Sequence, residues 1–160
     1  MRFVLVTLSA CLLLIGSQAA EARSRSQVVV YPVQDSFENV KQDAGDAIIK
    51  RGLVIDYTGQ IGAMLDRTAK DVGASKRIYG DAAALQFCSA ALSRRVMEAD
   101  PEDIAFCPYV IVVYTLASDP KTAYVGYRLL PRGGSRQTRT AVRSVNRLLD
   151  EIAREAAKRK

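Results

Sequence analysis

Two apolar, β-branched runs separated by a short polar segment limit the folds that this sequence can adopt. Residues 109–116 and 123–130 each have the length and composition of a strand. The Ser-Asp-Pro-Lys sequence at residues 118–121 is typical of a turn between antiparallel neighbours. Because such a hairpin does not fit an all-parallel doubly wound sheet, we predict an antiparallel or mixed sheet.

The rest of the chain alternates between strand-like and helix-like segments. Further strands are predicted from β-branched or extended patterns at residues 28–33, 53–58 and 84–88. Helices, identified by apolar residues at helical spacing and by capping residues, are predicted at residues 36–52, 61–73, 89–99 and 138–158. This order indicates an α+β fold, a single domain in which helices pack on a mostly antiparallel sheet of about five strands.

The N-terminal segment has the order of a secretory signal peptide. A basic residue precedes a largely apolar run over residues 3–15, and an Ala-Glu-Ala sequence ends at residue 22. The run is shorter than the roughly 20 residues that span a bilayer. We therefore predict that residues 1–22 are a cleaved signal and that residues 23–160 form the mature domain, which is periplasmic or secreted.

An alternative for the N-terminus is a lipid anchor. The sequence Leu8-Ser9-Ala10-Cys11 resembles a bacterial lipoprotein cleavage box, which would make Cys11 a lipidated N-terminal residue. The apolar run continues past Cys11, which favours the cleaved signal instead.

Two cysteines of the mature chain each follow a phenylalanine, in LQFCSA at residues 85–90 and IAFCPY at residues 104–109. An even number of cysteines in an exported protein favours a structural disulfide. Such a bond would close a loop of about 20 residues and stabilise the fold by roughly 3 kcal/mol. Alternatively, Cys88 precedes a predicted helix N-terminus, where a thiol pKa is lowered, and it would be a redox nucleophile with Cys107 as the resolving cysteine. Two separate buried thiols are the third interpretation.

The same two cysteines raise the question of a metal site. Two thiolates are a ligand set for Cu(I), but Met97 would lie about 13 Å along the helix axis from Cys88, too far to join them. We predict no metal site, with Cu(I) at Cys88 and Cys107 as an alternative.

Three segments resemble a known family: SFENVKQDAGDAIIKRGLVI, VMEADPEDIAFCPYVIVVY and AYVGYRLL. Together they are similar to the domain-of-unknown-function 302 family over about residues 28–153. The resemblance implies a small α+β domain with a mostly antiparallel sheet, similar in outline to the TATA-binding-protein-like fold and commonly dimeric. It implies no established activity.

The sequence departs from that family pattern at the two cysteines. Many members have Phe-Gly-Asn-Pro where this chain has Phe-Cys-Ser-Ala, and Leu-Pro where it has Cys107-Pro108. If this place is a binding site in the family, the site contains sulfur here. Its candidate rim residues are Phe87, Ser89, Phe106, Pro108 and Tyr109.

The chain has no histidine, which excludes several classes of enzyme. Without imidazole there is no Ser-His or Cys-His pair and no His-ligated metal. The acidic cluster Asp100, Glu102 and Asp103 flanks a proline, and we interpret it as a solvated turn with a capping aspartate. These observations favour a protein without enzymatic turnover, and we predict no catalytic residues and no cofactor.

The net charge of +6 resides in the last 29 residues, which carry 9 basic and 3 acidic side chains. One stripe of the predicted C-terminal helix consists of Arg136, Arg139, Arg143, Arg147, Arg154 and Lys158. A solvated helix face explains this stripe, and contact with an anionic membrane or an acidic partner is the alternative. No aromatic residue interleaves the arginines, so we expect no nucleic-acid binding.

The sequence thus favours an exported domain that binds a small ligand or a protein partner. The first alternative is a thiol-dependent redox, sulfur-handling or Cu(I)-binding protein that uses Cys88 and Cys107. The second alternative is a structural homodimer that exposes its basic helix to the cell envelope.

Overall fold

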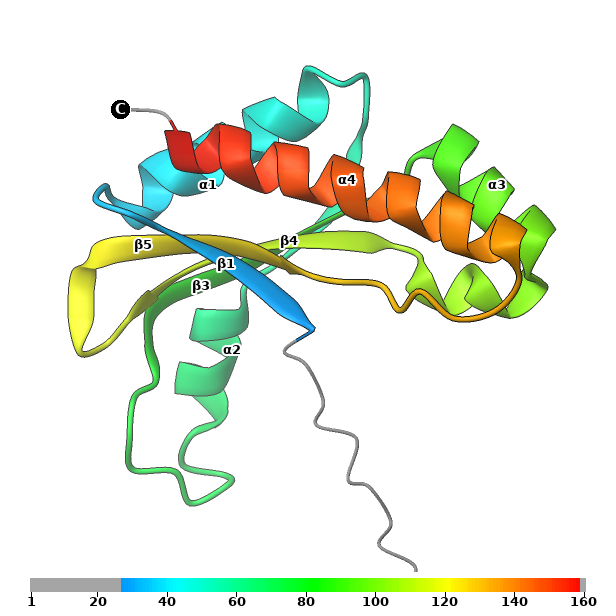
Figure 1. The fold of residues 1–160 in the computed structure, drawn as a ribbon. Helices are drawn as coiled ribbons and strands as arrows, with labels where there is room; N and C mark the ends of the chain where they lie inside the picture. Colours follow the sequence, from blue (N-terminus) through cyan, green and yellow to red (C-terminus); the bar gives the residue numbers. More distant parts are fainter. Residues whose placement is uncertain (1–26, 159–160) are drawn as a thin grey trace, which may run out of the picture.

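A computed structural model describes residues 27–158 and shows a five-stranded sheet with the strand order β1-β5-β4-β3-β2 (Figure 1). The strands are β1 (Val28–Val33), β2 (Ile55–Gly59), β3 (Tyr79–Phe87), β4 (Tyr109–Leu116) and β5 (Asp119–Arg128). The helices are α1 (Phe37–Ile49), α2 (Ile61–Thr68), α3 (Ala90–Ala99), the 3₁₀ helix η1 (Pro101–Phe106) and α4 (Arg136–Lys158). All four strand pairs are antiparallel, which confirms the predicted α+β fold. The predicted signal peptide and Cys11 lie outside the described residues.

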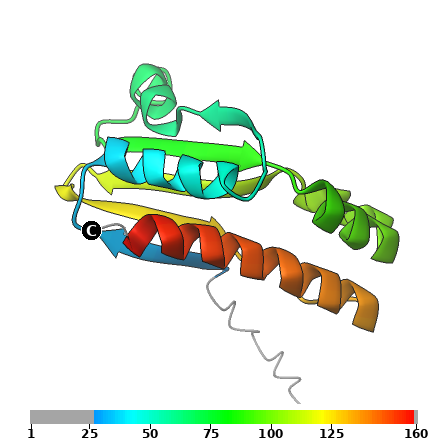
Figure 2. The ribbon, with the colours of Figure 1, turned by 90° about the horizontal axis from the view of Figure 1, so that it is seen from above.

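The helices are distributed unequally over the two faces of the sheet. Helices α1 and α4 lie side by side across one face, here called the upper face, and α3 extends past the end of the sheet (Figures 1 and 2). Of the described helices, only α2 lies against the opposite, lower face. Within residues 27–158, none of the helices is both long and apolar enough to cross a membrane.

The core lies between the upper face and the helices α1 and α4. Alternate residues of the central strands point into it, as the period of two in a strand requires. The largest fully buried side chains are Phe87, Ile48, Ile111, Leu149, Ile152, Val40, Val96, Val113, Val125, Val142 and Val145. Helix α4 supplies a large share of this core through Val142, Val145, Leu149 and Ile152.

Helix α2 contacts the sheet through a glycine. A Cβ atom on Gly62 would lie 2.9 Å from the backbone nitrogen of Ala82, so only glycine permits this close approach of helix to strand. The sequence predicted a longer helix, to residue 73, but α2 ends at Thr68. Its apolar side chains are largely outside the core, because Gly62 is the only buried residue of this helix.

Other boundaries also differ from the prediction. Strand β5 begins at Asp119, so the hairpin turn consists of Ala117 and Ser118 alone and the predicted turn residues extend the strand. Asp100-Pro101 ends α3 as expected, but the following residues form η1, with Asp100 accepting a hydrogen bond from the Glu102 amide. Strand β3 begins at Tyr79, five residues before the predicted start, 84.

A partly buried polar cluster attaches α4 to the edge of the sheet. Asp150 on α4 accepts hydrogen bonds from the hydroxyls of Tyr31 on β1, at 2.5 Å, and Tyr127 on β5, at 3.0 Å. Arg154 donates to the same carboxylate at 2.8 Å and lies over the Tyr31 ring. Burial raises the pKa of Asp150, but the hydrogen bonds from Tyr31, Arg154 and Tyr127 outweigh it and hold the pKa below its ordinary value.

We predict that Asp150→Asn lowers the free energy of unfolding by about 1–3 kcal/mol at pH 7, because two tyrosine hydroxyls lose a charged acceptor. The contribution of Asp150 is complete above its unfolded-state pKa of about 3.9 and is lost as the pH falls through the lower folded-state pKa. Urea unfolding from pH 7 to pH 2 should therefore show the two proteins converging in acid. Glu98→Gln, which breaks only the exposed ion pair with Arg94, is the control and should change little.

Candidate functional site

The register of β3 and β4 brings the two cysteines together at one end of the sheet. Phe87 pairs with Tyr109, so Cys88 leaves β3 beside the residues that lead into β4. The Sγ atoms of Cys88 and Cys107 are 2.6 Å apart, and both are free thiols in this structure. Both residues are partly exposed. The interpretation of two separate buried thiols is therefore wrong.

The cysteines belong to a chain of polar groups that leads into the core. Cys107 Sγ lies 3.3 Å from the hydroxyl of Ser93 on α3, and Ser93 donates a hydrogen bond of 3.2 Å to the hydroxyl of Tyr109. Tyr109 is buried, and its ring packs edge-on against Phe87. These contacts fix the position of Cys107 from two sides, because Ser93 lies on α3 and Cys88 follows the end of β3.

The electrostatics at Cys88 differ from the prediction. Burial and the hydrogen bond with Cys107 raise the pKa of Cys88 to about 11, although the Tyr109 backbone amide opposes the rise. This rise outweighs the lowering of the Cys88 pKa that was expected from the N-terminus of α3. The Ser89 side chain already caps this helix by accepting a hydrogen bond from the Leu92 amide. A thiol with this pKa is mostly protonated at neutral pH and is a weak nucleophile.

The five candidate rim residues fall into two groups. Phe87 and Tyr109 are buried and form the base of the cysteine site, so their placement at the rim is wrong. Ser89 and Phe106 are half-buried, and Pro108 is exposed and follows Cys107 through a cis peptide bond. No open cavity adjoins the sulfur atoms among the best-formed pockets of the described residues.

The thiol geometry also bears on the Cu(I) alternative. Metal–thiolate bonds are about 2.3 Å long for zinc, so a metal between two sulfur atoms 2.6 Å apart would require the side chains to separate. No third ligand is at hand, since residues 27–158 contain no group of three Cys, Asp or Glu side chains suited to a metal.

We predict that alkylation of Cys88 in the reduced protein continues to accelerate up to about pH 11, because only the thiolate reacts. The alkylation rate of an exposed cysteine would level off above its ordinary pKa of about 8.5. The measurement is the iodoacetamide rate against pH, with the modified residue identified by peptide mass spectrometry. In Cys107→Ser the midpoint should fall, because the partner thiol is gone. A plateau below pH 8 in the unmodified sequence would contradict the assignment.

The acidic cluster at η1 is only partly the solvated turn that the sequence predicted. Asp100 caps η1 as expected. Asp103, however, is buried, and its Oδ2 atom has no hydrogen-bond partner within residues 27–158. Burial, with the nearby charges of Asp100 and Glu102, raises the pKa of the Asp103 carboxyl.

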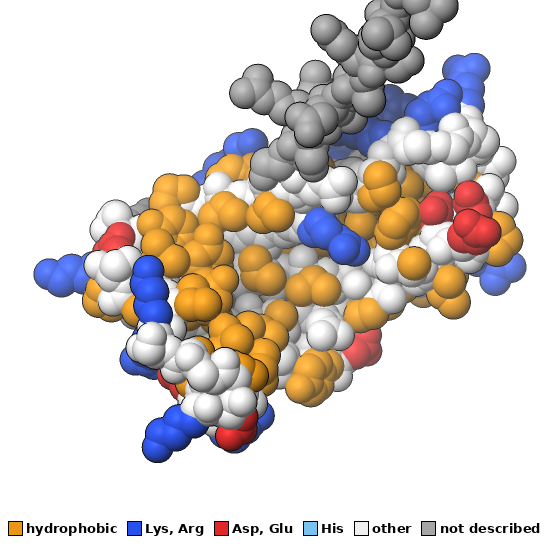
Figure 3. Space-filling model, turned by 90° about the horizontal axis from the view of Figure 1, so that it is seen from below, with side chains coloured by type: hydrophobic (Ala, Val, Ile, Leu, Met, Phe, Trp, Pro, Cys, Tyr) orange, Lys and Arg blue, Asp and Glu red, His pale blue; other side chains and the backbone are white. Residues whose placement is uncertain are grey.

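The lower face of the sheet carries a second group of side chains that sequence reasoning did not single out. On β4, the residues between the buried ones are apolar or aromatic and half-buried: Val110, Val112, Tyr114 and Leu116. Tyr114 stacks on Tyr124 at a ring separation of 5.1 Å and meets Tyr79 edge-on at 5.4 Å. Figure 3 shows apolar side chains spread over this face. The residue types were visible in the sequence, but only the strand register aligns the three tyrosines.

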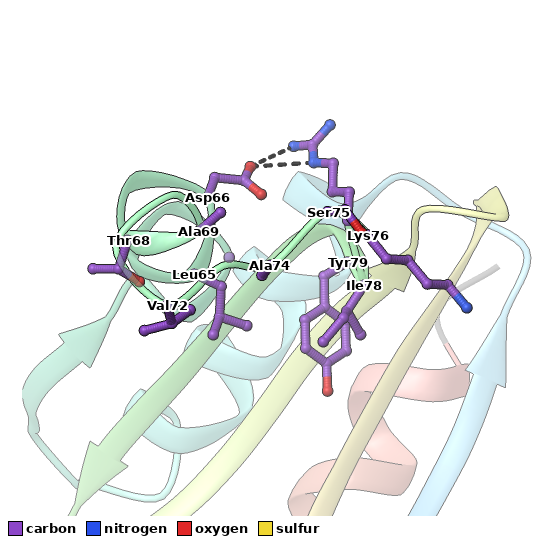
Figure 4. Close-up of a pocket in the computed structure, with 12 residues that line it drawn as sticks. Leu65, Asp66, Thr68, Ala69, Val72, Ala74, Ser75, Lys76, Ile78 and Tyr79 are labelled. Atoms are coloured by element: carbon purple, nitrogen blue, oxygen red, sulfur yellow. Dashed lines mark hydrogen bonds and ion pairs between the residues drawn. The ribbon is translucent and has the colours of Figure 1, made fainter.

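A pocket of about 580 Å³ lies between α2 and the start of β3. Leu65 and Val72 line one side, and Ile78 and Tyr79 line the other (Figure 4). The ion pair between Arg77 and Asp66, with a separation of 3.0 Å, bridges the two sides. Because Tyr79 also contacts Tyr114, the pocket adjoins the tyrosines of the lower face.

The basic residues predicted for the C-terminal helix are all exposed on α4. Arg154 is engaged by Asp150 and Tyr31, so it is a structural residue here. Arg139 donates to the Gly134 carbonyl and Arg143 donates to the Thr140 hydroxyl. Contact of this surface with an anionic membrane stays a prediction, as does a homodimer.

Comparisons with protein-family models and with curated proteins find no match. Among solved structures, this chain is similar to the crystal structure of the uncharacterized conserved protein DUF302 from Bacillus stearothermophilus. The TM-score is 0.68 at 12% sequence identity, and the match covers 82% of this chain and 99% of that chain. This chain therefore has the fold of a domain-of-unknown-function 302 protein, as the sequence motifs predicted.

Proposed function

We propose that this domain binds a small apolar ligand in the pocket between α2 and β3, without chemical turnover. The observation that carries the proposal is the pocket itself. Its volume of about 580 Å³ falls within the range of roughly 300–1,000 Å³ that is usual for ligand sites.

The composition of the pocket wall supports an apolar ligand. Leu65, Val72 and Ile78 present aliphatic side chains, and Val72 and Ile78 are 75% and 55% exposed. Covering such side chains removes apolar surface from water, which contributes about 25 cal/mol per Å². A ligand of matching shape would therefore gain affinity mainly from burial.

A few polar groups in the same pocket would orient the ligand. The Tyr79 hydroxyl makes no hydrogen bond within residues 27–158, and Ser75 also lines the pocket. Ligand sites commonly combine apolar walls with a small number of such groups. The shape favours a small molecule over a flat protein surface, because two elements enclose the pocket on opposite sides.

We predict that Ile78→Asp weakens binding of the uncharged fluorescent probe N-phenyl-1-naphthylamine at least tenfold, because a carboxylate replaces an apolar wall. Probe fluorescence titrated with protein gives the dissociation constant. Ile78 is 55% exposed and outside the core, so the fold should tolerate the change.

Ile104→Asp is the matched control for this test. Ile104 is 63% exposed on η1, away from the pocket, and its substitution should leave the dissociation constant unchanged. Equal losses in both variants, or no loss in Ile78→Asp, would refute the pocket as the binding site.

We infer a second, structural role for the cysteine pair, supported by the 2.6 Å separation of the sulfur atoms. After export, the two thiols would exchange with the disulfide of a thiol oxidant. The protein would gain the Cys88–Cys107 disulfide, and the oxidant would take up two electrons and two protons and leave as a dithiol. The high pKa of Cys88 favours this stable crosslink over the alternative of a catalytic nucleophile.

We predict that protein exported to an oxidising compartment has a mass two hydrogens below that of the reduced chain and does not react with iodoacetamide. Reduction should lower the free energy of unfolding by roughly 3 kcal/mol. Cys88→Ser should match the reduced protein and show no further effect of reductant. A bond that a mild thiol reductant opens readily would instead favour the redox alternative.

A further inference from the structure

We propose that the ligand of the pocket between α2 and β3 is an amphipathic anion, with an aliphatic chain against the apolar wall and an anionic head group beside Lys76 and Arg77. This inference rests on the proposed function, since it names the class of ligand for the same pocket. It is carried by the charge of the residues that surround the pocket.

The segment that forms the pocket is locally basic. Of the charged residues that line the pocket, Lys76 and Arg77 are basic and Asp66 is acidic. Both signs are present, but the balance is positive, so an anionic head group is favoured over a cationic one.

Two basic side chains that line the pocket have donor groups without a partner among the described residues. Arg77 donates through Nε to Asp66 and through Nη2 to the Gly80 carbonyl, which leaves Nη1 without a partner among the described residues. Lys76 forms no ion pair within residues 27–158, and it lies directly beside Arg77 in the sequence. A flexible lysine can lay its methylene groups along apolar surface and still place its ammonium group at a charged head.

The apolar part of the ligand has a defined place. Figure 4 shows Leu65 and Val72 projecting from the α2 side, with Ile78 and Tyr79 facing them from the start of β3. The Asp66–Arg77 pair lies at one end of the space between them. An aliphatic chain between these walls would therefore carry its head toward the Lys76–Arg77 segment.

The test is displacement of N-phenyl-1-naphthylamine by three ligands that share one chain: octanoate, octan-1-ol and octylammonium. Each ligand is compared between the unmodified protein and Lys76→Glu, so that differences in hydrophobicity among the ligands cancel. We expect Lys76→Glu to weaken the binding of octanoate about three- to tenfold. This is the range expected when one exposed charge contact is reversed. The affinity for octan-1-ol should change less than twofold, and octylammonium should bind more tightly.

Arg147→Glu is the control because it changes the net charge equally on α4, where no part of the pocket lies. It should leave all three displacement curves unchanged. The octanoate effect should also shrink as salt is raised, because exposed charges are screened.

The outcomes separate the two proposals. If Lys76→Glu changes the affinities for octanoate and octan-1-ol equally, or changes neither, the proposal of an anionic ligand is refuted. The proposal of an apolar ligand pocket is not affected by that result. If no ligand displaces the probe, or if the Ile78→Asp variant binds as well as the unmodified protein, the pocket proposal itself fails.

Discussion

The structure depends on a sheet whose central strand is apolar on both faces. Along β4, buried residues that face α1 and α4 alternate with half-buried valines, Tyr114 and Leu116 on the lower face. An antiparallel sheet with one solvated face normally alternates apolar with polar residues, whereas continuous apolar strands are typical of sheets covered on both sides. Here α1 and α4 cover the upper face, and α2 alone contacts the lower face within residues 27–158. Packing in the core between the upper face, α1 and α4 therefore does not explain why the lower face is apolar.

Helix α4 shows how the covered face is held in register. Its apolar stripe packs into the core, but hydrophobic contacts are not directional, so they do not by themselves fix where the helix lies along the sheet. The polar contacts do: Asp150 accepts from tyrosines on β1 and β5, and buried Asn146 bonds both the amide and the carbonyl of Leu130. Each contact is unsatisfied if the helix shifts by one turn, and a buried unpaired polar group costs about 1–3 kcal/mol. Burial thus stabilises the packing of α4, and the specific polar contacts fix the position of the helix along the sheet.

The sequence was sufficient for elements whose signals are local. The bounds of β1 and β4 and the caps Ser36 and Ser89 follow from β-branched runs and from side chains that accept a backbone amide. It was insufficient where the outcome depends on long-range packing. The apolar spacing of Ile61, Met64 and Leu65 is the same for a helix on either face of a sheet, so the position of α2 could not be predicted. Likewise, the helix N-terminus near Cys88 was visible in the sequence, but the burial that outweighs it was not.

The pocket and the cysteine pair lie at opposite ends of strand β3. The strand begins at Tyr79, in the wall of the pocket, and ends at Phe87, beside the cysteine pair, so its nine residues place the two regions about 26 Å apart. Sites at such a distance without shared partners usually behave additively. The thiols could be coupled to the pocket only through movement of β3 itself, which pairs with β4 over most of its length and with β2 from Ala84 to Phe87. The proposed crosslink would therefore stabilise the end of the sheet opposite the pocket, while the proposed ligand binding would depend on α2 and the charged segment that follows it.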